Sequence, residues 1–261
     1  MLCGLALAAL SSPALAQQPG APAAKGDWDI RLGAIALYQP DYDGSDDYEI
    51  AALPFVMASW RDLIFLRGPV LGANAITWQG TVRGDRLQAG PLIRYAFGRQ
   101  EDDSSDLRGM GDIDGGVEIG GFINYSLGPW SGELAVFRDA SSGHDGLTAR
   151  LSAGHRLPLG PKLMLRSEIA ATWADDNYTQ AFFGVTAAQS ARSGLRQYQP
   201  EGGLKDAGIT LDLNYSVTES WGVSGRLGYR RILGDAADSP LVATRGSADQ
   251  FTTGLFASYR F

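Results

Sequence analysis

The sequence has little of the chemistry on which metal proteins and many enzymes depend. Its 261 residues include one cysteine, Cys3, and two histidines, His144 and His155. A disulfide framework, a cysteine-based zinc site and a histidine-rich metal site are therefore excluded. Lys and Arg number 22 against 29 Asp and Glu, and no basic stripe is present that could neutralise nucleic-acid phosphates. The sequence predicts no cofactor, no metal and no nucleic-acid partner.

Long apolar runs are also missing beyond the N-terminus. The short run "LALAALSSPALA" ends in Ala14-Leu15-Ala16, which predicts an export signal over residues 1–16 with cleavage before Gln17. An uncut hydrophobic tail is the alternative. Residues 17–27 then form a flexible linker. No later stretch has the roughly 18 apolar residues of a membrane helix, so a membrane protein of this sequence would have to be a β-barrel over residues 28–261.

Alternation with a period of two dominates residues 28–261. The clearest case is Ala207–Val217, and the C-terminal run to Phe261 repeats it. Such alternation predicts strands whose two faces meet unlike environments, and the 34 glycines suit turns and curved sheet. The same pattern recurs in Trp28–Tyr38, Tyr48–Trp60, Arg86–Phe97, Val117–Leu127, Trp130–Asp139, Leu147–Leu157, Leu163–Trp173 and Trp221–Leu233.

The connections favour a membrane barrel over a soluble sandwich. Long and short links alternate along the chain, as with Ala174–Asp206 (long) and Thr218–Ser220 (short). Short periplasmic turns and long outer loops are typical of bacterial outer-membrane barrels. With both ends in the periplasm the strand number must be even, so we divide Leu63–Trp78 at "RGPV" into two strands. The sequence thus predicts an all-β, antiparallel up-and-down transmembrane barrel of twelve strands, with ten as the alternative.

Aromatic and charged residues fit the same fold. Aromatic residues near segment ends are expected to form two girdles at the lipid interfaces: Trp28, Tyr38, Trp60, Tyr95, Tyr125, Trp130, Trp173, Tyr215, Trp221, Tyr229 and Tyr259. Charged residues opposite the apolar stripes would each cost about 2–4 kcal/mol at mid-depth in lipid, so they are expected to face a lumen crossed by ion pairs. They are Arg31, Arg86, Arg94, Arg150, Arg166, Arg226, Arg230 and Arg260, with Asp29, Glu49, Glu118, Glu133, Glu168 and Asp212.

Four ordered motifs carry a resemblance to a known family. They are "YQPDYDGSDDYEIAALPFV" (38–56), "GRQEDDSSDLRGMGDID" (98–114), "AFFGVTAAQSARSGLRQYQPEGGLKDAG" (181–208) and "YRRILGDAADSPLV" (229–242). From about Trp28 to Phe261 the chain resembles the MltA-interacting protein family, also called MipA/OmpV. The resemblance implies an outer-membrane barrel. In some members it also implies a scaffold that joins a lytic transglycosylase to a bifunctional penicillin-binding protein, and in others a role in adhesion or osmotic response.

Two kinds of loop are weighed as sites. "RDASSGHDG" holds Asp139, Ser141, Ser142, His144 and Asp145, but a triad is assembled from separated parts of a fold, so a solvated loop is the preferred reading; His155 lies on an outward stripe. The acidic segments Asp41–Glu49 and Gly111–Gly116 place carboxylates two apart but lack EF-hand spacing. We expect them to be solvated outer loops that touch divalent ions of lipopolysaccharide. Gly234–Pro240 is expected to shape a loop.

Three functions remain open. The preferred one is a non-enzymatic scaffold, with no catalytic, cofactor-binding or metal residues. The others are a narrow small-solute channel or adhesion-related protein, and an outer-membrane hydrolase. Expected partners are outer-membrane lipid and lipopolysaccharide, the barrel-assembly machinery through the strand that ends at Phe261, and, by the resemblance, the two cell-wall enzymes. Those enzymes would reach the short turns Trp60–Asp62, Leu127–Trp130 and Thr218–Trp221.

Overall fold

The computed structural model describes residues 27–80, 85–141 and 143–261, so the predicted signal peptide and linker up to residue 26 lie outside the described residues. Thirteen β-strands form one antiparallel sheet in the described part of the chain. Their bounds are β1 Trp28–Pro40, β2 Tyr48–Trp60, β3 Ile64–Arg67, β4 Val70–Ala73, β5 Ile76–Gln79, β6 Arg86–Ala96, β7 Gly116–Leu127, β8 Trp130–Asp139, β9 Leu147–Pro158, β10 Leu163–Ala174, β11 Gly203–Ser216, β12 Trp221–Ile232 and β13 Asp249–Arg260.

The sheet closes into a barrel. Neighbours along the chain pair except for β4 and β5, β1 pairs with β13, and β4 also pairs with β6. Both β4 and β5 lie against β6, β4 along its outer half and β5 along its inner half, so they are two pieces of one wall strand interrupted at Asn74 and Ala75. The barrel therefore has twelve strands, as the parity argument predicts, rather than ten. The predicted strand Val70–Trp78 differs only by this break, where the Asn74 amide donates to the Asp62 carbonyl at 2.6 Å.

Side chains alternate between lipid and lumen as expected. Along β11, Ile209, Leu211 and Leu213 are exposed on the outside, whereas Asp212 lies inward. The charged residues predicted to face inward do so, and most take part in ion pairs. The aromatic rings lie outside and near strand ends, where Trp28 contacts Trp60, Tyr38 stacks on Tyr48, and Trp221 contacts Tyr259. His155 is also outside, with its ring 4.2 Å from that of Trp130.

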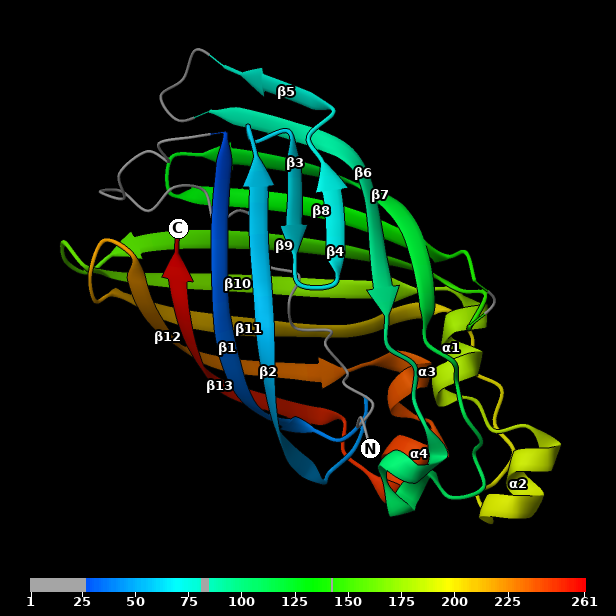
Figure 1. The fold of residues 1–261 in the computed structure, drawn as a ribbon. Helices are drawn as coiled ribbons and strands as arrows, with labels where there is room; N and C mark the ends of the chain where they lie inside the picture. The colour runs from blue at the N-terminus through cyan, green and yellow to red at the C-terminus, as the bar shows by residue number, and fades with distance from the viewer. Residues whose placement is uncertain (1–26, 81–84, 142) are drawn as a thin grey trace.

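The two ends of the barrel differ. Short turns join strands at the end that holds the start of β1 and Phe261, which is the periplasmic end. All the helices lie at the opposite, outer end (Figure 1). They are the α-helices α1 Asp176–Phe183, α2 Ala187–Ser193, α3 Gly234–Ala237 and α4 Pro240–Arg245, and the 3₁₀ turns η1 Glu101–Asp103 and η2 Ser105–Leu107. No helix among the described residues is long and apolar enough to cross a membrane.

The outer loops pack into a cap with a hydrophobic core of their own. Its main cluster consists of Tyr42, Leu107, Met110, Val185, Leu195 and Leu241, each no more than 7% exposed. A second cluster joins the end of β12 to the helices through Phe183, Ile232, Ala236 and Val242. These residues come from four different loops and the strand ends beside them, so the loops hold one another across the outer mouth. The expectation of solvated outer loops is therefore wrong for Tyr42 and its neighbours, because apolar burial outweighs hydration there.

Candidate functional site

Two cavities in the described part of the lumen meet at charged side chains. The outer cavity, about 200 Å³, lies beneath the cap and is lined by Tyr42, Asp43, Arg150 and Lys205 among others. The inner cavity, about 160 Å³, extends to the periplasmic turn after β11. Asp212 and Arg226 line both. The two cavities therefore adjoin at this pair.

Ion pairs cross the lumen where the two cavities adjoin. Arg226 donates to both carboxylate oxygens of Asp212, at 2.6 and 3.1 Å, which is the bidentate geometry that fixes a guanidinium most firmly. On the neighbouring strands Arg150 and Arg166 donate to the two oxygens of Glu168, at 2.7 and 3.2 Å. Each arginine and carboxylate in these ion pairs compensates a charge that would otherwise be unpaired in the confined lumen. The prediction that ion pairs cross the lumen is therefore confirmed. These ion pairs narrow the lumen between the two cavities.

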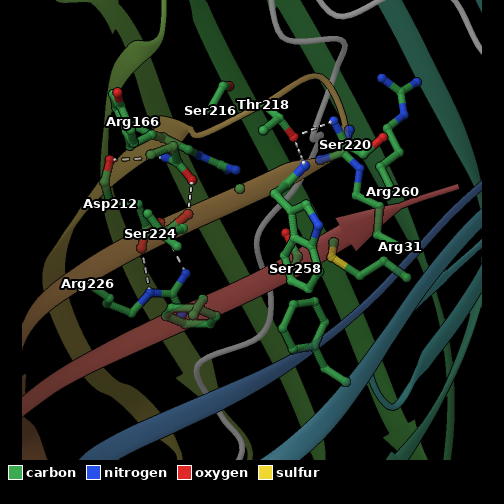
Figure 2. Close-up of a pocket in the computed structure, with 18 of the residues that line it drawn as sticks. Arg31, Arg166, Asp212, Ser216, Thr218, Ser220, Ser224, Arg226, Ser258 and Arg260 are labelled. Atoms are coloured by element: carbon green, nitrogen blue, oxygen red, sulfur yellow. Dashed lines mark hydrogen bonds and ion pairs between the residues drawn. The ribbon is translucent and has the colours of Figure 1, made fainter.

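The inner cavity, which we call the vestibule, is rich in arginine (Figure 2). Its charged lining consists of Arg31, Arg67, Arg166, Arg226 and Arg260 with two carboxylates, Asp212 and Glu219. Four of these arginines are ion-paired: Arg31 and Arg260 with Asp29, Arg166 with Glu168, and Arg226 with Asp212.

Asp29 and the turn Thr218–Trp221 organise the mouth of the vestibule. Arg260 holds Asp29 through two bonds of 2.9 and 3.0 Å, and Arg31 lies 3.8 Å from the same carboxylate. The Thr218 hydroxyl accepts from the backbone N–H groups of Ser220 and Trp221. Arg260 also donates its backbone N–H to Ser220. The vestibule is thus an arginine-lined recess, held by ion pairs and turn hydrogen bonds, that ends at the periplasmic rim.

A second charged cluster lies beneath the cap. Asp43 is bonded by Arg230 and, at 3.0 Å, by Lys205, and Asp206 bonds the same two cations at 3.1 and 2.5 Å. Burial alone would raise the pKa of Asp43, but Arg230 and Lys205 outweigh burial and hold that pKa well below its ordinary value. Asp43 comes from the loop after β1, whereas its partners come from β11 and β12. The cluster therefore ties the cap to the barrel wall.

The loop after β8 is held together by hydrogen bonds to Asp139. The Asp139 carboxylate accepts from the backbone N–H groups of Ser141, His144 and Asp145 at 2.7–2.9 Å, and the Ser141 hydroxyl donates to Asp139 at 3.0 Å. His144 Nε2 lies 2.9 Å from Glu118, and its Nδ1 accepts from Gly146. Ser141 is therefore bonded to Asp139. In a nucleophile–base pair, the serine would be bonded to the histidine instead. Ser142 lies outside the described residues.

The carboxylates of the acidic loops also form hydrogen bonds within the chain. Among the residues that the structure describes, no three His, Cys, Asp or Glu side chains are grouped to hold a metal. Glu101 accepts the backbone N–H groups of Gly109 and Gly111 at 2.8 and 2.7 Å, and these two bonds lower its pKa. Asp112, in the segment weighed for calcium, accepts from the backbone of Glu101 at 2.8 Å. In Gly234–Pro240, Asp235 accepts from Glu201 and Ser239 caps α4, so this segment shapes the loop as expected.

The family follows from comparison with known proteins. The family model described as MltA-interacting protein MipA matches residues 32–261. The chain belongs to this family. The MltA-interacting protein of Escherichia coli K12 is 25% identical over 255 residues, which cover 95% of each chain. The putative outer membrane protein YiaT of the same strain is 26% identical over 123 residues, 47% of this chain and 48% of YiaT.

Solved structures agree with the barrel. The NanC porin superposes with a TM-score of 0.50 at 9% identity, covering 90% of this chain and all of that one. The COG4313 outer membrane channel from Pseudomonas putida F1 has a TM-score of 0.46 at 13% identity, covering 94% and 99%. At such identities the likeness concerns the fold alone. The family match, the closed antiparallel sheet and a relative named as a putative outer membrane protein make this MipA family member an outer-membrane β-barrel.

One signal in the sequence could have found the central ion pair of this MipA family barrel. The turn between β11 and β12 is short, and a short turn fixes the register of its hairpin. Asp212 then stands directly opposite Arg226, as the observed pairing confirms. The cluster around Asp43 has no such signal, because Asp43 lies 162 residues from Lys205 and 187 from Arg230.

Proposed function

We propose that this protein is a non-enzymatic scaffold of the outer membrane that binds a cell-wall lytic transglycosylase at its periplasmic rim. The observation that carries the proposal is the contrast between the two ends: packed loops cover the outer mouth, whereas the arginine-lined vestibule reaches the periplasmic turn Thr218–Trp221. A relative that covers 95% of the chain bears the name MltA-interacting protein, which supports the class of partner. The second cell-wall enzyme expected from the family, a bifunctional penicillin-binding protein, would join the same assembly.

Photo-crosslinking at the rim tests the scaffold. The photoreactive residue p-benzoylphenylalanine replaces Glu219 or Gly160, which are exposed in two periplasmic turns. Irradiated envelopes should yield a crosslinked band that contains a lytic transglycosylase. The same residue at Arg196, exposed in the outer cap, is the matched control and should give no such band. Failure of both periplasmic positions to capture a transglycosylase, in cells that express one, would refute the scaffold.

A narrow channel is the second candidate, because cavities lie on both sides of the Asp212–Arg226 pair. The packed cap and the ion pairs argue against steady conduction, since both cross the path of a solute. Purified protein in a planar lipid bilayer is therefore expected to give no stable current steps at neutral pH. Reproducible single-channel steps from the unmodified protein would favour the channel over the scaffold.

A further inference from the structure

The barrel wall is incomplete beside the outer half of β2. Strand β2 spans Tyr48–Trp60, but β3 pairs only with Met57–Trp60, and the last contact is the bond from the Gly68 N–H to the Val56 carbonyl at 3.1 Å. Figure 1 shows the β3–β4 hairpin turning back while β2 continues toward the cap. Within the described residues, no strand pairs with Tyr48–Phe55 on that side.

The far side of the opening is the continuation of β6. Val70 at the hairpin tip pairs with Arg94, and Tyr95 donates its N–H to the Pro69 carbonyl. Beyond Ala96 the chain runs on to Arg99, which is bridged to Ile113. Two wall strands are missing at this level, so about three strand spacings, roughly 14 Å, separate the backbones. We call the opening between Tyr48–Phe55, the hairpin tip and 97–99 the window.

The edge of β2 at the window lacks one hydrogen-bond donor, at Pro54. Odd-numbered residues of β2 bond to β1, as the Asp41–Asp47 bond and the register show, so even-numbered residues direct their backbone groups to the window. They are Tyr48, Ile50, Ala52 and Pro54. Proline has no N–H and stops a sheet from adding a strand. Pro54 stands where pairing with β3 ends, so the edge is ill suited to binding a strand from a second copy.

The window connects two apolar surfaces. Outside, Ile50 is 77% exposed and Val56 41%, continuous with the lipid-facing belt below the Tyr38–Tyr48 stack. Inside, Phe55 lies over Gly33 and contacts Phe256. Behind the hairpin a luminal cluster adds more apolar surface: Phe65, Leu92, Phe122, Ala135 and Phe137. Apolar residues that face inward are unusual in a lumen otherwise lined by ion pairs.

We propose that the window admits a hydrocarbon chain from the outer leaflet of the surrounding membrane to the apolar luminal face of β2. Lipid is the occupant because the flanks of the window belong to the surface that lipid already covers, and because Phe55 and Leu53 offer apolar contact inside. This site is separate from the periplasmic rim and does not depend on the scaffold role. Its ligand class is an acyl chain or a comparably apolar solute of the leaflet.

Site-specific quenching tests the window. A bimane label is attached to Leu53→Cys in the chain from Gln17 to Phe261, which contains no other cysteine, and this chain is placed in phosphatidylcholine vesicles with or without doxyl-labelled lipid. Leu53 faces inward, so a sealed wall would protect the label. With an open window, doxyl lipid should quench it by roughly half as much as it quenches a label at Ile50→Cys on the outer surface, since quenching requires contact with lipid chains.

A label at Ser224→Cys is the matched luminal control. Ser224 pairs with Phe256, Phe256 with Ile35, and Ile35 with Leu53, so Ser224 shares the row of Leu53 but is remote from the window. Its label should stay unquenched. Ala51→Cys, also inward, repeats the measurement if the Leu53 variant folds poorly. Equal, low quenching at Leu53 and Ser224 overturns the proposal. Quenching at Leu53 that appears only after deletion of residues 17–26 also overturns it, because that segment and not lipid would then fill the window. Quenching that appears only when the protein is diluted in the vesicles overturns it as well, because a second copy would then fill the window.

Discussion

Replacement of Asp43 by asparagine is expected to destabilise the protein by about 3–5 kcal/mol, because removing one partner leaves buried charges uncompensated. Asp43 carries the bonds from Arg230 and Lys205, whose cations would then share Asp206 alone. The loss should appear as a lower urea midpoint for unfolding from detergent micelles. External protease should also cleave the cap faster, since this cluster joins it to β11 and β12.

Two variants separate this effect from a general loss of charge. Asp46→Asn, three residues along the same loop and exposed, should change stability by less than about 0.5 kcal/mol. Adding Lys205→Met to Asp43→Asn removes the cation left in excess and should recover part of the loss. If Asp43→Asn unfolds at the same urea concentration as the parent, the cluster does not hold the cap.

Replacement of Leu227 by arginine is expected to cost about 2–4 kcal/mol in a bilayer, since the side chain lies outside the barrel near the middle of β12 and charges there face hydrocarbon. Leu227 is 63% exposed and pairs with Leu211 and Thr253. The fraction folded in vesicles across a urea series, read from the heat-dependent shift on electrophoresis, measures the change.

Leu204→Arg is the control at another depth. Leu204 also faces outward but lies near the outer end of β11, opposite Trp173 of the aromatic girdle. The cost there should be only about 0–1 kcal/mol, because an arginine at the interface reaches water and headgroups. Equal costs at the two positions would contradict the assigned membrane depth.

The wall of the barrel could be predicted from the sequence because each strand carries its own signal. Period-two alternation located Trp28, Tyr48 and Trp221 at strand starts, and the alternation of long and short links supplied the topology. Strand β11 starts four residues before the predicted Ala207, since a register shift at Thr172 and Trp173 accommodates the extra residues. Bulges of this kind break the alternation on which such a prediction depends.

The cap could not be predicted, because its contacts are distant in sequence. Tyr42 and Leu241 share one core although 199 positions separate them, and helices such as α1, with eight residues, are too short to be recognised by periodicity. The window was missed for a related reason. Its signal is a shortfall: β3 has four residues beside the thirteen of β2, and a period-two pattern in β2 looks the same with or without a partner.

The barrel can close only when β13 pairs with β1. Leu32 lies beside Tyr259, and Arg260 donates to Asp29, so the first and last strands of the described sheet complete the circle. A truncated chain without β13 leaves the edges of β1 and β12 unpaired, and unpaired strand edges promote aggregation. The junction between β1 and β13 therefore records whether the circle is complete.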